Sequence, residues 1–330
     1  MKVAVVGAGV MGTYHARVIA QSERAELARI VDPDEVVGQK LAERYGSAWC
    51  PEFETAGLDA VVVAAPTELH TDLVLRALEA ELPVLVEKPV SAELAETLRI
   101  LGSAEAGSIP FMCGFVERFN PAILTVRALM SEPPVHVTAT RHSPYAGRIR
   151  TGVAWDLLIH DVDACLRLFD TPPVGVRAGL GFFHPASGEA GGEDVAEAVL
   201  TFGSGAVASI SASRIGQRKV RAISLSELHR SIEVDLLRRD VTIYRHVSHD
   251  SPSHDGLGYR QQTIIEIPEL VSGREPLAAQ LDHFLDLIAG AVDIAEERRS
   301  ILAAHQVIDE VTASTAEPGI AAAPAPRVGA

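Results

Sequence analysis

Residues 3–12 of this chain read Val-Ala-Val-Val-Gly-Ala-Gly-Val-Met-Gly, an apolar run that ends in the pattern Gly-x-Gly-x-x-Gly. The apolar run is typical of a buried strand, and the residues from Val10 and Met11 onward have the spacing of a helix. At such a turn Gly7 permits the tight bend, Gly9 lets the backbone approach a pyrophosphate, and Gly12 lets the helix pack on the strand. Because the first N–H groups of the helix then point at the phosphates, this stretch predicts a dinucleotide-binding turn.

An acidic residue at the expected distance supports this interpretation and indicates which cofactor binds. Asp32 ends the next strand-like run, 20 residues past Gly12, where a carboxylate accepts hydrogen bonds from an adenosine ribose diol. The same charge repels a 2′-phosphate, and Pro33, Asp34 and Glu35 provide no Arg to bind one. We therefore expect NAD in preference to NADP.

Composition and charge limit the class of protein. The chain has 330 residues, is 47% hydrophobic and has a net charge of −15, which is typical of a globular protein with room for two domains. The negative charge argues against nucleic acid or an anionic membrane as the main partner. No apolar run reaches the roughly 18 residues of a membrane span, and Lys2 is followed at once by a predicted strand, so we expect no signal peptide. Three separated cysteines (Cys50, Cys113 and Cys165) fit reduced thiols and a cytoplasmic location.

The first 118 residues alternate predicted strands with predicted helices. The strands are continuous Val, Ala and Ile runs, as in a parallel sheet covered on both faces. We therefore expect an α/β fold that begins with a doubly wound Rossmann domain over residues 1–118. The predicted strands are Lys2–Val6, Glu26–Val31, Ala60–Ala65, Val84–Glu87 and Pro110–Gly114, and the predicted helices are Val10–Gln21, Glu35–Tyr45, Glu68–Ala80 and Ala92–Glu105.

The pattern changes after this point and predicts an α+β domain over residues 119–312. Short strand-like runs joined by turns such as Gly203-Ser-Gly205 indicate a large, mostly antiparallel sheet. Two more helices, Leu277–Ile288 and Asp293–Val311, follow it, with the alternative that they pack back on the first domain. Residues 313–330 are rich in Ala, Pro and Gly without periodicity, which predicts a disordered tail. The predicted strands are Val135–Thr140, Val174–Phe183, Val195–Phe202, Ala206–Arg214, Val220–Ser226, Ile232–Val234, Val241–His246 and Thr263–Ile267, and the predicted helices before them are Pro121–Met130 and Val153–Phe169.

Two polar segments follow predicted strands of the parallel sheet, at the edge where such sheets bind ligands. In the first, Pro66, Thr67 and His70 either contact the cofactor or, for Thr67, cap the next helix. The second is Glu87-Lys88-Pro89, in which an acid–base pair interrupts an apolar run. One interpretation is a solvated loop pair. The other places Glu87 and Lys88 at the nicotinamide end, with Lys88 stabilising a developing alkoxide or passing a proton.

A third constellation lies on the predicted helix Val153–Phe169. Asp156, His160, Asp163 and Arg167 recur at helical spacing as one polar stripe on a helix that is otherwise apolar. The stripe is either a row of ion pairs that faces water or an acid–base site. In the second case His160 exchanges a proton while Asp156 orients it or binds substrate hydroxyls.

Taken in order, these motifs resemble the glucose–fructose oxidoreductase / inositol dehydrogenase / rhizopine catabolism (Gfo/Idh/MocA) family over residues 1–312. The family carries an N-terminal Gly-x-Gly-x-x-Gly, a Glu-Lys-Pro turn and an Asp-x-x-x-His pair on one helix, which correspond here to Gly7–Gly12, Glu87–Pro89 and Asp156–His160. The resemblance implies an NAD(P)-dependent dehydrogenase of a sugar or cyclitol, in which Lys88, Asp156 and His160 are catalytic. It also implies a homodimer or homotetramer. The family usually has glycines before the Asp, whereas this chain has Trp155.

A finer resemblance points to the branch that oxidises nucleotide-linked amino sugars at the 3-hydroxyl. It rests on the segment from Gly114 to Pro121 and on Trp155-Asp-Leu-Leu-Ile-His-Asp. It implies that Arg118, Asn120 and Arg148 bind substrate together with Lys88, Asp156 and His160. Arg148, with Arg141 and Arg150, either clamps a diphosphate or is ordinary surface charge.

Other interpretations remain open at this point. An inositol or simple sugar needs no diphosphate clamp, and a relative that oxidises a sugar only transiently during elimination would show no net cofactor change. A non-catalytic dinucleotide-binding redox sensor is the alternative from another class. The histidines between His246 and His254 fit no common zinc spacing, so we expect a polar loop there and no metal.

Overall fold

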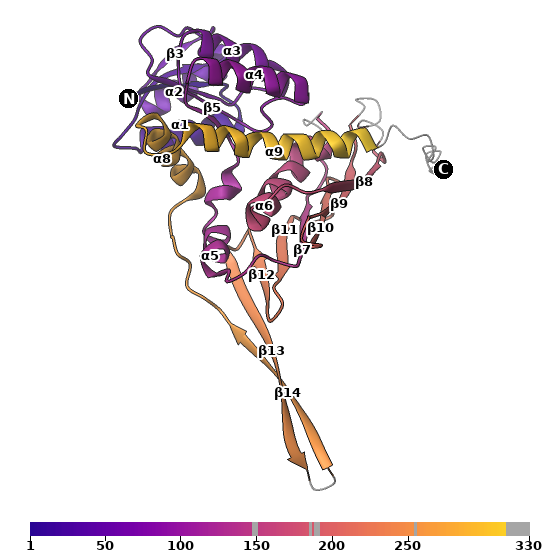
Figure 1. Ribbon diagram of the computed structural model, residues 1–330. Coiled ribbons are helices and arrows are strands. Elements are labelled where there is room, and N and C mark those ends of the chain that lie inside the picture. Colours follow the sequence, from indigo (N-terminus) through magenta and orange to yellow (C-terminus); the bar gives the residue numbers. More distant parts are fainter. Residues whose placement is uncertain (147–150, 185–186, 188–191, 254–255, 315–330) are drawn as a thin grey trace, which may run out of the picture. The chain divides into compact units, whose positions relative to one another are not determined.

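The computed structural model describes residues 1–146, 151–184, 187, 192–253 and 256–314 (Figure 1). The chain divides into two compact units. The first comprises Met1–Phe119 and Arg274–Asp309, and the second comprises Asn120–Gly273 with the chain from Glu310 onward. Of the predicted disordered tail over residues 313–330, Ala313 is instead the last residue of a helix, and residues 315–330 lie outside the described residues.

The first unit contains a six-stranded sheet in the order β3-β2-β1-β4-β5-β6, with all neighbouring strands parallel (Figure 1). The order reverses between β1 and β4, so their carboxyl ends form the switch point where such sheets bind ligands. This arrangement confirms the predicted doubly wound domain. The strands are β1 (Lys2–Val6), β2 (Glu26–Val31), β3 (Ala48–Cys50), β4 (Ala60–Val63), β5 (Val84–Val86) and β6 (Phe111–Cys113), and the helices between them are α1 (Val10–Ala20), α2 (Glu35–Tyr45), the short η1 (Thr67–Leu69), α3 (His70–Glu79) and α4 (Leu94–Ala106), with η2 (Val116–Phe119) after β6.

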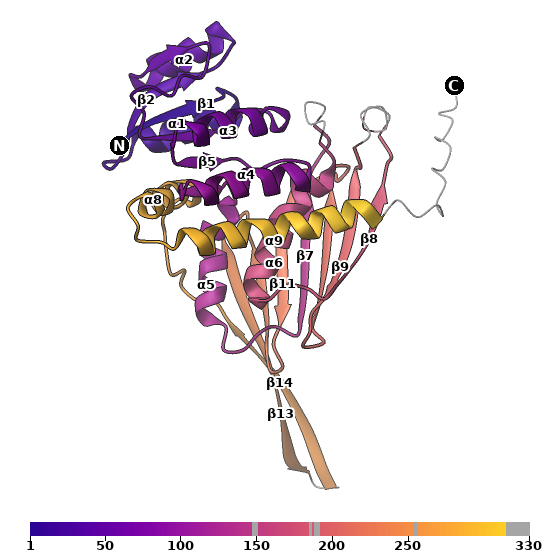
Figure 2. The same ribbon diagram turned by 45° about the horizontal axis from the view of Figure 1, so that its top comes forward.

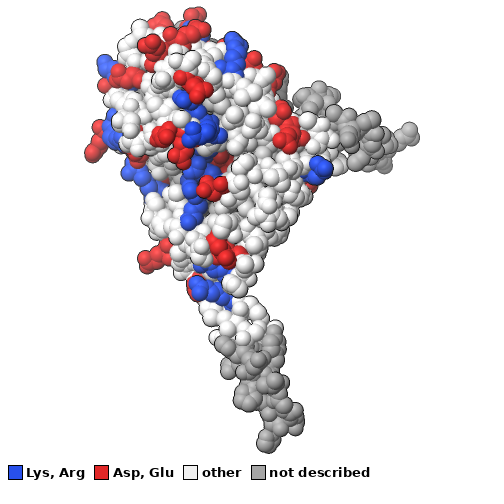
Figure 3. All heavy atoms as spheres, in the orientation of Figure 1, with Lys and Arg blue, Asp and Glu red and all other residues white. Residues whose placement is uncertain are grey.

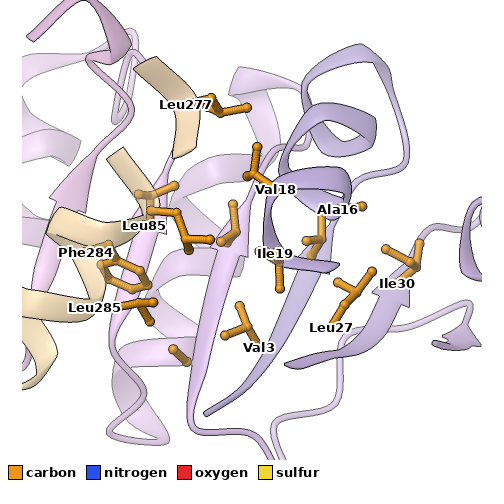
Figure 4. Close-up of a cluster of buried hydrophobic side chains, with 14 of the residues drawn as sticks. Val3, Ala16, Val18, Ile19, Leu27, Ile30, Leu85, Leu277, Phe284 and Leu285 are labelled. Atoms are coloured by element: carbon orange, nitrogen blue, oxygen red, sulfur yellow. The ribbon is translucent and has the colours of Figure 1, made fainter. Parts of the chain in front are cut away.

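The core of this unit includes helix α8 (Pro276–Ile288), which comes from the far end of the sequence. Figure 4 shows Leu277, Phe284 and Leu285 of α8 beside Val18 and Ile19 of α1, and they belong to one cluster of buried residues. Burying a side chain of this size stabilises the fold by about 1.5–3 kcal/mol. The packing explains why residues 274–309, including most of α9 (Ile294–Ala313), belong to the first unit although the predicted second domain ran to residue 312.

The second unit is built on an eight-stranded sheet in the order β14-β13-β12-β11-β7-β10-β9-β8. Its neighbouring strands are antiparallel except β7 and β10, which are parallel, so the predicted mostly antiparallel sheet is confirmed. The elements are α5 (Pro121–Leu129), β7 (His136–His142), the π-helix η3 (Ala154–Leu158), α6 (Ile159–Phe169), β8 (Gly175–Gly181), β9 (Val195–Thr201), β10 (Val207–Ser213), β11 (Val220–Ser226), β12 (Ser231–Asp235), β13 (Asp240–Ser253) and β14 (Gly256–Glu266).

Helices α5 and α6 cover this sheet from one side, as Figure 2 shows. The strands alternate accordingly, since Ala196, Ala198 and Leu200 of β9 are buried while the residues between them are not. Strand β9 thus contributes alternate side chains to the core of the second unit.

The long hairpin of β13 and β14 corrects one expectation. The segment from His246 was predicted to be a polar loop, but strand β13 continues to Ser253. The local Ser, Pro and Asp residues favour a loop over a strand. The strand forms because cross-strand pairing with β14 supplies its backbone hydrogen bonds. His254 lies outside the described residues.

Charge on the first unit is mixed in sign. Figure 3 shows acidic and basic side chains interspersed over the visible face of this unit. No helix within the described ranges is both long and apolar enough to cross a membrane.

Candidate active site

The glycine turn has the geometry that a pyrophosphate site requires. Gly7 has φ +101°, and a Cβ there would lie 2.6 Å from the Ala64 carbonyl oxygen. A Cβ on Gly12 would lie 1.8 Å from the Gly7 carbonyl oxygen, so helix and strand meet there through backbone alone. At Gly9, by contrast, no described heavy atom lies within 4 Å of an added Cβ, and this position is exposed. The turn is therefore closed on the protein side and open on the side from which a ligand approaches.

Helix α1 begins at this turn with Gly9 as its N-cap and without a side-chain cap among the described residues. Its first residues, Val10 and Met11, are exposed and half-buried, respectively. The N–H groups at such a helix start, together with the positive end of the helix dipole, suit phosphate oxygens. The donor set therefore fits the pyrophosphate of a dinucleotide.

Asp32, at the end of β2, is half-buried and shapes the same turn. One carboxylate oxygen accepts a hydrogen bond from the Ala8 N–H at 2.7 Å, and the other accepts from the Asp34 N–H at 2.9 Å. Each oxygen retains acceptor capacity beyond its one backbone donor. Asp32 thus holds the glycine turn and can still accept hydrogen bonds from a ribose.

The segment after β4 differs from the expectation at His70. Pro66 is exposed and Thr67 is half-buried in η1, and no side-chain cap is found in this described segment, so the capping role of Thr67 is not observed. His70 is only 1% exposed, and its Nδ1 and Nε2 lie 2.9 Å from the carbonyl oxygens of Pro89 and Ala65, respectively. Burial lowers the pKa of His70. Both ring nitrogens face the protein's own backbone, which corrects the expectation that His70 contacts the cofactor.

The Glu87-Lys88-Pro89 segment follows β5 at the same edge of the sheet. Glu87 is buried, and its Oε1 lies 2.7 Å from Nε2 of His15 on α1. Lys88 is half-buried. A Cβ added to Gly114 would come within 3.0 Å of Glu87, so the neighbouring strand end is also closely packed. The solvated-loop interpretation therefore fails for Glu87, whose carboxylate is engaged inside the protein.

The predicted acid–base residues lie on a helix whose first turn is irregular. Asp156 belongs to the π-helix η3 and His160 to the first turn of α6, where a regular α-helix over Val153–Phe169 was expected. Single π turns are frequent at functional sites. Asp156 and His160 are both half-buried, whereas Asp163 is buried. The predicted stripe is therefore only partly accessible to water.

Glu193, which the sequence analysis did not identify, fixes the start of this helix. Its Oε1 accepts a hydrogen bond from the Ala154 N–H at 2.6 Å, and its carbonyl oxygen accepts from the Val153 N–H at 3.1 Å. Burial raises the pKa of Glu193. Its position just before β9 has no motif, so spacing in the sequence could not reveal it.

Two polar residues expected at the substrate have structural partners instead. Arg118 is 5% exposed, and its guanidinium bonds Glu297 at 3.0 Å and stacks over Phe115. Asn120 caps α5 through the Ala122 N–H at 3.0 Å and is 4% exposed. We therefore withdraw both from the substrate-binding set.

Arg141 is likewise not available as a phosphate clamp. Its Nε and a terminal nitrogen bond both carboxylate oxygens of Asp161, at 2.8 and 3.0 Å, and both side chains are at most 2% exposed. Arg148 and Arg150 lie outside the described residues. Within the described part of the chain no group of three or more His, Cys, Asp or Glu is placed to hold a metal ion.

Comparison with known protein families identifies the family of this chain. Residues 1–115 match the oxidoreductase family with an NAD-binding Rossmann fold, and residues 122–226 match the GFO/IDH/MocA C-terminal domain. The chain belongs to the Gfo/Idh/MocA oxidoreductase family. This membership confirms the resemblance and NAD as the cofactor, and it makes an enzymatic role the conclusion in place of a redox sensor.

Two members of the family are similar in sequence. A UDP-N-acetylglucosamine 3-dehydrogenase from Acidithiobacillus ferrooxidans is 29% identical over 318 residues, which cover 93% of this chain and 96% of that protein. An inositol 2-dehydrogenase from Rhizobium meliloti is 30% identical over 226 residues, which cover 63% of this chain and 67% of that protein.

Solved structures of the family share the fold. The UDP-N-acetylglucosamine 3-dehydrogenase from Acidithiobacillus ferrooxidans has a TM-score of 0.80 at 28% identity, covering 95% of this chain and 98% of that chain. Levoglucosan dehydrogenase in complex with NADH has a TM-score of 0.80 at 19% identity, covering 96% of this chain and 97% of that chain.

Proposed function

We propose that this enzyme oxidises a secondary hydroxyl of a nucleotide-linked amino sugar, at position 3 of a UDP-linked N-acetylhexosamine. The observation that carries the proposal is the extent of similarity. The likeness to the UDP-N-acetylglucosamine 3-dehydrogenase spans 93% of the chain, including the second unit, whereas the likeness to the inositol 2-dehydrogenase spans 63%. Substrate-specific contacts in a two-domain dehydrogenase come largely from outside the dinucleotide-binding domain, so the wider match is the more informative one.

Three residues would carry the chemistry. His160 takes the proton of the substrate hydroxyl, Asp156 orients the imidazole or binds a neighbouring hydroxyl, and Lys88 donates a hydrogen bond to the oxygen as its negative charge develops. Bound NAD⁺ supplies the acceptor for the hydride. The half-buried setting of all three side chains suits these roles, because a polar group partly removed from water interacts more strongly with developing charge.

The second candidate substrate is an inositol or another cyclitol. The 30% identity to the inositol 2-dehydrogenase favours it. A second reason is that Arg118 and Arg141 form ion pairs within the protein, so neither offers its guanidinium to a diphosphate.

A substrate screen separates these candidates. UDP-N-acetylglucosamine, UDP-glucose, myo-inositol, scyllo-inositol and glucose would each be incubated with NAD or NADP, and absorbance followed at 340 nm. We expect kcat/KM for UDP-N-acetylglucosamine to exceed that for either inositol by more than about 100-fold. The reverse order would replace the proposal with the cyclitol alternative, and turnover without net absorbance change would indicate transient oxidation.

The assignment of the base is tested by His160→Ala. We expect kcat to fall by about 10²–10⁴ while NAD binding is retained, because a positioned general base contributes about this much. In the wild type, kcat/KM for oxidation should rise with pH as the imidazole becomes neutral, and the variant should lose this limb. A variant that keeps both the rate and the limb places the base elsewhere. Lys88→Met should also lower kcat, and the double variant should fall by much less than the product of the two effects.

We also propose a homodimer or homotetramer that acts in the cytoplasm. Cys50, Cys113 and Cys165 are present as thiols and not as disulfides, which supports a reducing compartment. Light scattering after size-exclusion chromatography would give the assembly state, and a monomeric mass would contradict this part of the proposal.

A further inference from the structure

We propose that three buried histidines, His15, His70 and His305, are positioning residues that hold the segment 87–90 and thereby place the Lys88 ammonium. The inference concerns the first unit alone and rests on the role of Lys88 in the proposed function. The three histidines come from α1, α3 and α9, far apart in the sequence, and each contacts a different group of the segment.

His15 holds the residue before Lys88. Its Nε2 lies 2.7 Å from Oε1 of Glu87, the histidine is 2% exposed and the glutamate is 7% exposed. The Glu87 N–H also donates to the Val63 carbonyl oxygen at 2.8 Å, so both backbone and side chain are fixed. A buried carboxylate requires such a partner, since an unpaired one would be strongly destabilising.

His70 holds the residue after Lys88. Its Nδ1 lies 2.9 Å from the Pro89 carbonyl oxygen, and its Nε2 lies 2.9 Å from that of Ala65 at the end of the preceding strand segment. A neutral imidazole has one N–H, so the ring can donate to only one of these two carbonyl oxygens, and we take Pro89 as the acceptor.

His305 holds the next backbone position. Its Nε2 accepts a hydrogen bond from the Val90 N–H at 3.0 Å, and its Nδ1 donates to the Ile301 carbonyl oxygen at 2.9 Å. These two contacts define the tautomer, because Nε2 must carry the lone pair to accept from an amide. The side chain is fully buried.

Together these contacts fix both sides of Lys88. A strand-to-helix connection is usually exposed and mobile, yet Glu87, Pro89 and Val90 are buried while Lys88 between them is half-buried. An apolar residue would fill each histidine position without the cost of burying an imidazole. An apolar residue at any of these positions would, however, lose the hydrogen bond that the histidine makes to the segment 87–90. Catalytic groups need such support, because a displacement of about 1 Å can lower the rate about 100-fold.

Matched variants separate positioning from packing. An Asn amide reaches the place of Nδ1 and a Gln amide that of Nε2, so His70→Asn keeps the donor to Pro89 and His70→Gln loses it. His305→Gln keeps an acceptor for Val90, whereas His305→Phe keeps the ring and loses the acceptor. His15→Gln keeps the contact to Glu87, and His15→Leu removes it.

Two readouts are needed, and one is independent of the reaction. Hydrogen exchange of the full-length protein reports on the Val90 amide, which should exchange about tenfold faster in His305→Phe than in His305→Gln. Steady-state kinetics use the best substrate of the screen above. We expect kcat to fall by about 10- to 100-fold in His70→Gln, His305→Phe and His15→Leu, with the KM for NAD unchanged and most of the rate kept in His70→Asn, His305→Gln and His15→Gln.

The outcomes decide the inference. Equal kcat within each pair, or faster exchange at Val90 without any loss of kcat, would overturn it, as would a higher rate in His70→Gln than in His70→Asn. If Lys88→Met itself keeps the wild-type kcat, the proposed role of Lys88 fails, while the exchange measurement still tests whether the histidines hold the segment. Circular dichroism of every variant shows whether the protein is folded, and the conservative variants keep the test valid where a drastic one unfolds.

Discussion

Acidification should destabilise the first unit through one residue, His305. The side chain is fully buried, and desolvation together with the Arg118 charge lowers its pKa from 6.5 to about 4, against a smaller opposing contribution from the Ile301 carbonyl. Between these values the unfolded chain binds a proton that the folded protein excludes, so stability falls as the pH decreases from about 6.5 to about 4. Each unit of difference between the pKa values of His305 in the unfolded and folded states corresponds to about 1.4 kcal/mol, so the free energy of unfolding decreases by about 3 kcal/mol.

The measurement compares the wild type with His305→Gln, which has no titrating group at this position. In a Trp155→Phe background Trp49 of β3 is the remaining tryptophan, so its fluorescence during urea denaturation reports on the first unit. The free energy of unfolding of the wild type, minus that of the variant, should decrease by about 3 kcal/mol between pH 7 and pH 4. The exposed His229, changed to Gln, is the surface control. A difference that stays constant over this range would refute the reasoning, because it would show that His305 binds a proton equally in both states.

Two further predictions concern Asp32 and the buried ion pair of the second unit. Asp32→Asn keeps an acceptor for the Ala8 N–H but removes the charge, so the variant should bind both cofactors and lose its preference for NAD. Asp32→Ala should in addition weaken the binding of both cofactors. The values of kcat/KM with NAD and with NADP measure both effects. Arg141→Met leaves the Asp161 carboxylate buried without its ion-pair partner and should destabilise the second unit by about 3–5 kcal/mol. Urea denaturation followed by Trp155 fluorescence measures this loss. The double variant Arg141→Met with Asp161→Leu should recover part of it.

Sequence patterns predicted those features of the fold that depend on local periodicity. The glycine turn, the Val-rich strands and the alternating strands of the second sheet each carry their signal within a few residues, and all are found. Strand β3 was missed because its sequence, Ala-Trp-Cys, lacks the Val-rich run that marked the equally short strand β5. The extension of β13 to Ser253 depends on pairing with β14, and the π turn at Ala154–Leu158 is coupled to backbone hydrogen bonds that Glu193 accepts. Neither is encoded in the spacing of residues along the segment itself.

The site was harder to predict than the fold because a motif does not reveal the partners of its residues. Arg118 and Asn120 lie in a segment that resembles a substrate-binding motif. The partner of Arg118, however, is Glu297, 179 positions away, and Asn120 bonds Leu236 as well as its own helix. A buried side chain whose hydrogen bonds are made inside the protein has a structural role that its motif alone does not reveal.

Histidine shows most clearly why burial has to be known before a role is assigned. The sequence alone does not show which of His15, His70, His160 and His305 are buried, and the motifs assigned proton transfer to His160 and a cofactor contact to His70. The structure separates them, since His160 is half-buried whereas the other three are at most 2% exposed. An imidazole whose nitrogens face backbone groups or a buried carboxylate can fix a segment of chain, but a base for a substrate hydroxyl must present a nitrogen to the ligand. We therefore expect histidine side chains to have two kinds of role in this enzyme, with solvent access deciding which one applies.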